Sequence, residues 1–484
     1  MSRVAPTTPR SAPGPRVGES VADLEISGAW LVDPTSGREG PGEVVVTDGI
    51  IEAVTWLDDR SADGASPDRV IVVPGFVDLH THLREPGNED AETISSGLAA
   101  AAHGGFTTVC AMPNTEPALD DPAVLGRMLA AAAASGVPVR LLAHGAVTAS
   151  RSGERLAPLG ELADGGVVGF TDDGAPIASS AVLRSALAYA GQFGLPIVDH
   201  PEDRVSTDGA EANEGLVATV LGLRGWPAGA EASAVGRDLA VLADALRAVP
   251  AARLHLTNLS TAASPELVRD AKRRGLPLTC DVTPHHLALT DEWLAGARRW
   301  AWEVPADSRG PWADGALVAE PYDPACRVNP PLRSAADARA CLTALADGTV
   351  DAVATDHAPH ASVDKDLEFG LAATGISGLE TALGVLLAAV HAGELTLRRA
   401  IEALTVGPAG VLGARFGREG GPCLVAGRRA DLVVIDRAAT WRVEPAGLRS
   451  RGHNTPLLGR DLAGLVLLTV ADGRIAYAAD DEIA

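Results

Sequence analysis

The sequence predicts an α/β fold in which residues 71–415 form a (β/α)8 TIM-like barrel. Eight short apolar stretches alternate there with alanine-rich helical stretches, an order that is typical of parallel β/α proteins. Polar residues follow most of the apolar stretches, and such proteins place their active sites at the carboxyl ends of the barrel strands. A doubly wound sheet would alternate in the same way, but no G-x-G-x-x-G motif follows the first predicted strand.

The two ends of the chain predict a small composite β domain, made of residues 17–70 and 416–484. Both ends carry short strand-like runs, with Asp48-Gly49 and Asp472-Gly473 as hairpin turn signals. The N-terminal β unit cannot bury itself alone, so we expect the two ends to pair. Residues 1–16 are rich in Pro, Ser and Thr and predict a disordered tail rather than a signal peptide. The strands predicted at the two ends are 23–27, 29–32, 42–47, 50–54, 430–435, 462–470 and 474–477.

The elements of the barrel follow from the same alternation. Short apolar stretches bounded by turn and helix signals are typical of buried parallel strands. These stretches cover residues 70–79, 106–112, 137–143, 166–170, 195–198, 253–256, 276–280 and 350–354. The stretches between them predict helices because alanine has the most favourable helix propensity. The predicted helices cover residues 91–102, 122–134, 179–192, 228–249, 265–274 and 335–345.

Composition and charge narrow the class of protein. The formal net charge of −23 argues against binding to nucleic acid or to an anionic membrane surface. No run of about 18 apolar residues predicts a membrane span. The five cysteines are scattered without a C-x-x-C pair, which fits reduced thiols in the cytoplasm. We therefore expect a cytoplasmic protein that acts on a small molecule.

The prediction of function begins at the end of the first barrel strand. His80 and His82 are two residues apart, so in an extended strand their side chains point to the same side and can hold one metal ion. Arg84 keeps the same parity and would add a fixed positive charge for a substrate carboxylate. Taken alone, a His-x-His pair on a surface is common by chance. The Pro86-Gly87 pair after the strand end favours the functional interpretation.

Other predicted strands end in similar polar groups. Each group is weak evidence alone, since an Asp-Gly pair is usually a turn and a single histidine is usually structural. In a barrel these ends converge on one mouth, so together they predict a metal-dependent site. The groups are Asn114, Asp172 with Asp173, His200, His255 with Asn258, and Asp356 with His360.

Several motifs form a specific set. They are Asp78-Leu-His80-Thr-His82-Leu-Arg84-Glu-Pro-Gly, Ala111-Met-Pro-Asn114-Thr, Phe170-Thr-Asp-Asp173-Gly, Asp199-His200-Pro-Glu-Asp, Val328-Asn329-Pro-Pro-Leu-Arg, Ala354-Thr-Asp356-His-Ala-Pro-His360, Ala426-Gly-Arg-Arg-Ala-Asp431-Leu-Val-Val and Asn454-Thr-Pro-Leu-Leu-Gly. With this set the chain resembles the amidohydrolase superfamily and, within it, the type I branch of the dihydroorotases. The resemblance covers nearly the whole chain after the tail and implies a metal-dependent amidohydrolase barrel with a β domain.

The resemblance implies a site for one or two metal ions, usually zinc. His80, His82 and Asp356 would hold the first ion, and Asp173 would bridge to a second ion held by His200. Asp173 is preferred to the aspartate before it because it fits the family's spacing to His200. The metal would lower the pKa of a bound water. Asp356 would act as general acid and base between that water and a ring nitrogen.

The resemblance also implies the reaction, which is reversible cyclisation of N-carbamoyl-L-aspartate to L-dihydroorotate in de novo pyrimidine (UMP) synthesis. The residues implied to bind the substrate are Arg84, Asn114 and His360 at its carboxylate, Asn329 at its ring, and Thr374 and Gly375 through their backbone. Cleavage or closure of a cyclic amide needs a polarised carbonyl, a poised hydroxide and a proton donor. The metal-binding residues together with Asp356 would offer all three. Homo-oligomerisation is implied by the resemblance alone.

The chain departs from the family pattern at two places. The family has His-Val-Ser-Thr after strand six, and its histidine binds the second metal, whereas this chain has Asn258 in that position. Asparagine is a poor zinc ligand, and His255 would face the other way in a regular strand. We therefore predict a weakened or absent second metal site. The Trp-rich segment 291–326 is longer than the family predicts and is interpreted as a lid, a partner surface or an ordered excursion.

Two other functions stay open. Hydantoinases, dihydropyrimidinases and allantoinases share the fold but typically carry a carboxylated lysine on strand four, where this chain has Asp172 and Asp173. Arg84 and Asn114 also favour an acidic pyrimidine. Alternatively, the chain is an inactive dihydroorotase-like subunit that scaffolds aspartate transcarbamoylase. Such relatives usually lose the metal-binding histidines, and Asn258 is the residue here that supports this alternative.

Overall fold

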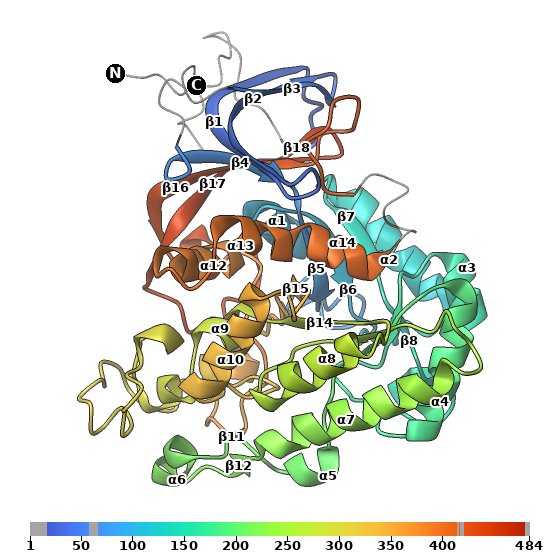
Figure 1. Cartoon of the computed structure of the whole chain (residues 1–484), viewed down its shortest axis with the longest axis vertical. Coiled ribbons are helices and arrows are strands. Elements are labelled where there is room, and N and C mark those ends of the chain that lie inside the picture. Colours follow the sequence, from blue (N-terminus) through green and yellow to red (C-terminus); the bar gives the residue numbers. More distant parts are fainter. Residues whose placement is uncertain (1–16, 58–65, 414–415, 417–420, 480–484) are drawn as a thin grey trace.

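The computed structural model describes residues 17–57, 66–413, 416 and 421–479 (Figure 1). The predicted tail, residues 1–16, lies outside the described residues. Strands from the two ends of the chain, blue and red in Figure 1, lie together at one end of the molecule, and the barrel with its helices forms the rest. None of the described helices is long and apolar enough to cross a membrane.

Both ends of the chain contribute strands to one seven-stranded sheet. In order across the sheet these are β18 (Arg474–Ala478), β17 (Asp461–Ala471), β16 (Leu432–Arg442), β4 (Val70–Pro74), β1 (Asp23–Asp33), β2 (Arg38–Thr47) and β3 (Ile50–Trp56). β4 joins the two halves because it pairs parallel with β1 and antiparallel with β16. Buried apolar side chains from both halves, including Leu31, Ile51 and Val470, form one core. This pairing supports the proposal of a composite domain from residues 17–70 and 416–484.

Two Asp-Gly turns connect strands of the sheet. Asp48 and Gly49 have φ angles of 50° and 74°, and Asp472 and Gly473 have φ angles of 48° and 69°. Two successive positive φ angles are typical of type I′ hairpin turns, which confirms the turn predictions. The turns also touch, because a Cβ on Gly49 would lie 2.7 Å from the carbonyl oxygen of Gly473. Both ends of the chain therefore meet at their hairpins as well as through β4.

The strand predicted over residues 70–79 is wrong in one respect. The structure has two strands there, β4 in the sheet and β5 (Phe76–Thr81) in the barrel. The chain changes sheets at Gly75, whose N–H donates to the carbonyl oxygen of Asp431 at 2.9 Å. A Cβ on Gly75 would lie 2.2 Å from Thr107 Oγ1. The apolar run conceals the change because both strands are buried.

Parallel strands form a (β/α)8 barrel, which confirms the predicted fold class. They are β5, β6 (Phe106–Ala111), β7 (Arg140–Ala143), β8 (Gly145–Ala146), β9 (Phe170–Thr171), β10 (Ile197–Asp199), β13 (Leu254–Leu256), β14 (Leu278–Val282) and β15 (Ala352–Val353). The pairing runs β5-β6-β7 and β8-β9-β10-β13-β14-β15. His144 alone separates β7 from β8, so these two serve as one barrel strand. A parallel bridge between Thr81 and His357 closes the ring.

Helices surround the barrel strands (Figure 1), and all six predicted helices are present with shifted ends. The α-helices are α1 (Ile94–His103), α2 (Pro122–Ser135), α3 (Leu159–Gly165), α4 (Ser180–Ala190), α5 (Arg204–Thr207), α6 (Leu216–Leu221), α7 (Ala228–Ala245), α8 (Ala263–Arg273), α9 (Pro284–Ala288), α10 (Ala335–Ala346), α11 (Ser362–Lys365), α12 (Ala382–His391), α13 (Leu397–Leu404) and α14 (Val406–Leu412). Side-chain caps fix several of the starts; for example, Thr93 accepts from the Ser96 N–H before α1, and Asp121 accepts from the Ala123 N–H before α2.

Short elements complete the loops. They are the strands β11 (Ala212–Asn213) and β12 (Gly225–Trp226) and the 3-10 turns η1 (Ala149–Arg151), η2 (Gly191–Phe193), η3 (Asp291–Ala295), η4 (Ala301–Glu303), η5 (Pro324–Cys326) and η6 (Pro445–Gly447). Three of these turns, η3 to η5, lie in the Trp-rich segment 291–326. Trp293 is fully buried, Trp300 stacks on Trp302, and the Arg460 guanidinium lies 3.8 Å from the centre of the Trp300 ring. These contacts support the interpretation of an ordered excursion.

We expect Gly75→Ala to destabilise the chain by about 1–3 kcal/mol, because the new methyl group would overlap the buried Thr107 side chain. Gly126→Ala is the matched control. Gly126 is exposed within α2 with nothing within 4 Å of its new Cβ, so alanine should stabilise that helix by roughly 0.5–1 kcal/mol. Urea unfolding of both variants measures the difference. Equal stability of the two variants would contradict the packing argument.

Candidate metal centre and active site

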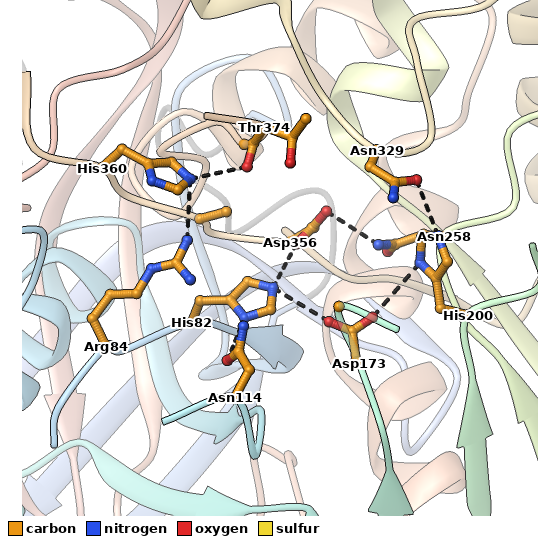
Figure 2. A pocket seen from close by; sticks show the side chains of 13 residues that line it. His82, Arg84, Asn114, Asp173, His200, Asn258, Asn329, Asp356, His360 and Thr374 are labelled. Atoms are coloured by element: carbon orange, nitrogen blue, oxygen red, sulfur yellow. Dashed lines mark hydrogen bonds and ion pairs between the residues drawn. The ribbon is translucent and has the colours of Figure 1, made fainter. Parts of the chain in front are cut away.

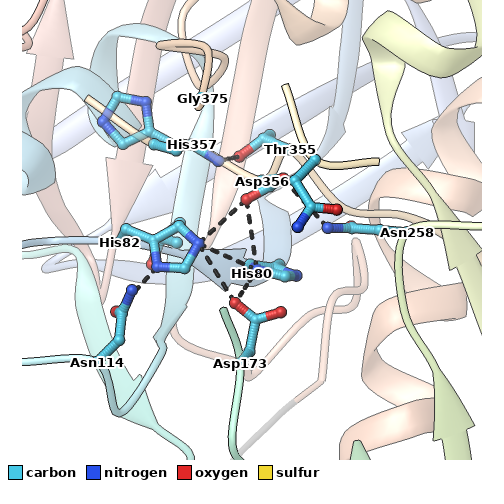
Figure 3. A network of polar contacts seen from close by, with 12 residues as sticks. His80, His82, Asn114, Asp173, Asn258, Thr355, Asp356, His357 and Gly375 are labelled. Carbon is cyan, nitrogen blue, oxygen red and sulfur yellow. Dashed lines mark hydrogen bonds and ion pairs between the residues drawn. The ribbon is translucent and has the colours of Figure 1, made fainter. Parts of the chain in front are cut away.

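Four side chains meet at the carboxyl end of the barrel (Figure 3). His80 lies in β5 and His82 just after it, while Asp173 follows β9 and Asp356 follows β15. His80 Nε2 lies 3.2 Å from His82 Nε2 and 3.1 Å from Asp173 Oδ2, and His82 Nε2 lies 3.5 Å from the same oxygen. Asp356 Oδ1 lies 3.4 Å from His80 Nε2 and 3.1 Å from His82 Nε2.

These distances fit a divalent cation of the size of zinc. A tetrahedral zinc ion with ligand bonds of about 2.05 Å separates its ligand atoms by about 3.3 Å, close to the five distances above. Asp356 contacts both imidazoles but does not belong to the set of donors that all lie within 4.8 Å of one another. The two facing imidazole nitrogens have at most one proton to share between them, so a cation satisfies both better than a hydrogen bond does. The donor atoms of His80, His82 and Asp173 all lie within 4.8 Å of one another.

The other nitrogen of each imidazole is held by a neighbouring side chain. His80 Nδ1 lies 3.0 Å from Thr257 Oγ1, and His82 Nδ1 lies 2.9 Å from Asn114 Oδ1. The amide oxygen can only accept, so His82 Nδ1 carries the proton and leaves Nε2 free as a ligand. The structure thus places Asn114, predicted to bind a substrate carboxylate, in contact with a candidate metal ligand as well.

The centre carries a strong negative potential. Burial lowers the pKa of the His80 imidazole, but Asp173 and Asp356 outweigh it and raise this pKa to about 10. Burial also opposes ionisation of the carboxylates, yet His80 holds the pKa of Asp173 well below its usual range and lowers that of Asp356 to about 2. Two ionised, buried carboxylates therefore face one point, which favours a bound cation.

The two adjacent aspartates that follow β9 point in different directions. Asp172 turns away and accepts hydrogen bonds from the Thr148 N–H at 3.0 Å and from its hydroxyl at 2.5 Å. Asp173 faces the cluster, and its Oδ1 lies 3.6 Å from His200 Nδ1. The aspartate preferred from the sequence is thus the one that lies at the centre.

Asn258 lies beside Asp356 as a hydrogen-bond donor. A carboxylate oxygen only accepts, so the Asn258 amide nitrogen must face Asp356 Oδ2, and it does so at 3.1 Å. The Asn258 carbonyl oxygen, its one group able to bind a metal, lies 3.4 Å from Thr257 Oγ1. His255 lies away from the cavity and contacts Asp281 Oδ2 at 2.8 Å, which confirms its predicted orientation.

His200 is held at one nitrogen and free at the other. Its Nε2 lies 3.2 Å from Asn329 Oδ1. Its buried Nδ1 has no hydrogen-bond partner within the described part of the chain and faces Asp173. A second metal ion would therefore find one imidazole nitrogen and one carboxylate oxygen here, without the further imidazole that the family supplies.

A cavity of about 190 Å³ opens above the cluster (Figure 2). Apart from His80, which lies beneath it, the structure brings every predicted site residue to its wall. These residues are His82, Arg84, Asn114, Asp173, His200, Asn258, Asn329, Asp356, His360, Thr374 and Gly375, joined by Gly174 and Ala358.

Arg84 supplies positive charge at one side of this cavity. Its Nε donates to the carbonyl oxygen of Pro359 at 3.1 Å, and its Nη2 lies 3.3 Å from His360 Nε2. The carbonyl oxygen of Thr374 lies 2.9 Å from the same nitrogen of His360. Burial, with the positive charge of Arg84, lowers the pKa of His360 to about 3, so this imidazole is neutral. An anionic ligand here would meet a fixed cation beside a neutral imidazole.

Three site residues have left-handed backbone conformations. The φ angles are 62° at Arg84, 60° at Asn258 and 46° at Asp356. Side chains other than glycine rarely adopt this region, and its cost is sustained mainly where function demands a particular side-chain direction. All three positions lie just after barrel strands, where the chain turns to direct a side chain into the cavity.

Sequence reasoning missed Thr257 and Asp281. The buried Asp281 carboxylate accepts from the Thr257 hydroxyl at 3.0 Å and from the Asn258 N–H at 2.7 Å. Thr257 then holds His80, so a chain of hydrogen bonds leads from Asp281 to the cluster. Asp281 directly follows the strand predicted over 276–280. The signal that identified the other strand ends was therefore present there too.

Comparisons with known proteins agree with this site. A family described as Dihydro-orotase-like matches residues 69–261. The dihydroorotase of Anaeromyxobacter dehalogenans strain 2CP-1 is 47% identical over 94% of this chain and 98% of its own length. The dihydroorotase of Pelotomaculum thermopropionicum is 40% identical over 93% of this chain and 98% of its own. The chain belongs to the dihydroorotase family.

Solved structures share the fold of this dihydroorotase family member at lower identity. An L-hydantoinase (dihydropyrimidinase) from Arthrobacter aurescens has a TM-score of 0.73 and 23% identity, covering 95% of this chain and 97% of its own. A dihydropyrimidinase from Brevibacillus agri has a TM-score of 0.71 and 19% identity, covering 94% and 95%. At such identity the likeness shows the amidohydrolase barrel fold alone.

We expect Asp173→Asn to weaken zinc binding by more than the roughly 10- to 100-fold that loss of a ligand's hydrogen-bond partner costs. The variant keeps the shape of the side chain but removes a negative charge from the cluster. Asp172→Asn is the matched control, because Asp172 contacts Thr148 and turns away from the cluster. Competition with a chromophoric chelator measures both affinities. Equal zinc affinities for the two variants would exclude Asp173 as a ligand.

Proposed function

We propose that the chain catalyses the reversible cyclisation of N-carbamoyl-L-aspartate to L-dihydroorotate with loss of water, the third step of de novo pyrimidine synthesis. The observation that carries the proposal is the union of the His80, His82, Asp173 and Asp356 cluster with the Arg84 guanidinium in one cavity. The family membership supports it. Hydrolysis of a cyclic amide that carries a carboxylate needs the metal-binding cluster for the amide and the positive charge of Arg84 for the carboxylate.

We propose that the metal is zinc and that one ion is bound. His80, His82, Asp173 and Asp356 would hold it, since each of the two carboxylates has an oxygen within 3.5 Å of both imidazole nitrogens. When bound, the ion supplies Lewis-acid polarisation of a carbonyl oxygen and lowers the pKa of water. Asn258 directs its amide nitrogen, which cannot bind a metal, toward Asp356. This orientation supports a single ion rather than two.

Asp356 is the proposed general acid and base. Its Oδ2 is fixed by the Asn258 amide, and the residue lines the cavity. From this position the carboxylate would take a proton from the attacking water during hydrolysis and deliver it to the ring nitrogen that leaves. In the direction of cyclisation the same group would remove the proton from the attacking nitrogen.

The remaining wall of the cavity would bind the substrate. The proposed roles are the substrate carboxylate for Arg84, Asn114 and His360, the pyrimidine ring for Asn329, and backbone contacts for Thr374 and Gly375. A bidentate guanidinium–carboxylate pair gives geometric specificity as well as charge. The positive charge of Arg84 beside a neutral His360 supports a substrate whose ring carries a carboxylate.

We extend the proposal to the setting of the enzyme on the resemblance alone. It would act in the cytoplasm and self-associate, with aspartate transcarbamoylase as a candidate partner. The intact histidines of the cluster favour an active enzyme over an inactive scaffold. The two adjacent aspartates at the end of β9, with no lysine there, favour a dihydroorotase over a hydantoinase or allantoinase.

The zinc-loaded protein should hydrolyse dihydroorotate, seen as loss of its ultraviolet absorbance. Asp356→Ala should reduce turnover by at least about 100-fold, because it removes the acid and base. Hydantoin and allantoin serve as control substrates and should stay intact. Hydrolysis of hydantoin or allantoin in preference to dihydroorotate would replace the proposed substrate, and no turnover of any of the three would favour the scaffold.

The wild-type chain should bind one zinc ion, measured by elemental analysis after dialysis against a low zinc concentration. Asn258→His should raise the content toward two ions, because a new imidazole would join His200 Nδ1 and Asp173 Oδ1. Asn258→Ala is the control and should stay at one. Two ions in the wild-type chain would contradict the assignment of Asn258 as a hydrogen-bond donor.

A further inference from the structure

A segment from the C-terminal part of the chain reaches the wall of the cavity. Residues 449–454, here called the strap, lie in the connection between β16 and β17, two strands of the seven-stranded sheet. The last residue of the strap, Asn454, begins the Asn-Thr-Pro motif of the sequence. Asn454 is 8% exposed and is not among the described residues that line the cavity.

The Asn454 side chain connects the two loops that carry the predicted substrate contacts. Its amide nitrogen donates to the carbonyl oxygens of Ala358 at 3.0 Å and Gly375 at 2.9 Å. Its amide oxygen accepts from the His360 N–H at 2.9 Å and lies 3.0 Å from the Ser377 hydroxyl oxygen, which donates to the Gly452 carbonyl oxygen of the strap at 2.5 Å. We propose that Asn454 is a positioning residue that fixes His360 and the Gly375 backbone relative to each other and thereby sets the affinity for the substrate.

The chemistry of the position selects asparagine. A primary amide offers two donors and two acceptor sites, and Asn454 uses both donors and accepts from the His360 N–H. Aspartate has the same shape but no donor, so it would place a carboxylate against two carbonyl oxygens. Alanine would leave the Ala358 and Gly375 carbonyls and the His360 N–H without these partners. Buried polar groups that lose their partners are costly, so the loops would shift toward other contacts.

The strap itself is fixed to the barrel independently of Asn454. Glu92, which is fully buried, accepts from the Ser450 hydroxyl at 2.6 Å and from the Arg451 N–H at 3.2 Å. Glu380 accepts from the Arg449 N–H at 2.7 Å. These two glutamates precede α1 and α12, so two helices of the barrel hold the strap in place.

The strap packs directly against the wall of the cavity at Gly452. A Cβ on Gly452 would lie 2.6 Å from the Pro359 side chain and 2.7 Å from the His360 backbone nitrogen. Only glycine permits this approach, which brings Asn454 within reach of both loops. The strap thus acts as a fixed support, and Asn454 transmits its position to His360 and Gly375.

The inference rests on the proposed function, because the kinetic effect requires that His360 and Gly375 contact the substrate. Dihydroorotate hydrolysis by the zinc-loaded Asn454→Asp variant tests it. KM should rise by about tenfold, the equivalent of one lost hydrogen bond, while kcat stays within about threefold and zinc content is unchanged. His453→Ala, one residue earlier in the strap, is the matched control and should keep wild-type kinetics. A lower kcat at unchanged KM, or unchanged kinetics, would overturn the proposal.

Amide hydrogen exchange tests the same inference without catalysis. Asn454→Ala should accelerate exchange of the His360 amide, because its acceptor is removed, whereas Asn454→Asp should leave that amide protected. Equal protection in all variants would overturn the proposal, even if the wild-type chain did not hydrolyse dihydroorotate. If the Asn454 variants fail to fold, Ser377→Ala removes the hydroxyl that donates to Gly452 of the strap and contacts Asn454, and a KM increase of about two- to threefold is then expected. An unchanged KM in that folded variant would also overturn it.

Discussion

The buried cluster of two imidazoles and two carboxylates is the interaction on which the rest of the site depends. Carboxylates removed from water are costly unless a positive charge compensates them, and Asp173 and Asp356 each lie within 3.5 Å of both His80 and His82. Neutral polar side chains contact three of the four members. Thr257 contacts His80, Asn114 contacts His82 and Asn258 contacts Asp356. The protein thus maintains a negative centre that a divalent cation can neutralise, and it places the positive Arg84 beside that centre for the substrate.

The seven-stranded sheet and the barrel are joined more closely than their sequence order indicates. Gly75 carries the chain from the sheet into the strand that bears His80, with no room for a side chain. At the other end of the chain, the strap leaves the sheet and packs against the loop that bears His360. The connections of the sheet therefore reach the site at two places, one before the barrel segment of the chain and one after it. A change in the packing of either connection would therefore displace residues of the site, such as His80 or His360.

The sequence allowed the fold class and the members of the cavity wall to be predicted, because both depend on local order. The apolar stretches alternate with helices, and polar residues such as His82 and Asp356 stand just after strands. The change of sheet at Gly75 was not predictable, since the space beside Gly75 is filled by Thr107 of another strand, which leaves no room for a side chain. The roles of Thr257 and Asn454 depend on hydrogen bonds to residues 177 and 94 positions away, such as His80 and His360. No local pattern encodes such contacts.

Asn258 shows how one side chain can change the division of labour at a metal centre. In place of the family's histidine it presents an amide N–H to Asp356 Oδ2, while Asp356 Oδ1 faces the two imidazoles. A histidine that bound a metal through one nitrogen could not also donate to Asp356 from that nitrogen. Asn258 therefore supplies a hydrogen bond that holds the proposed acid and base in a single orientation. In our proposal the same residue removes a ligand of a second metal ion and leaves the cluster of His80, His82, Asp173 and Asp356 in place.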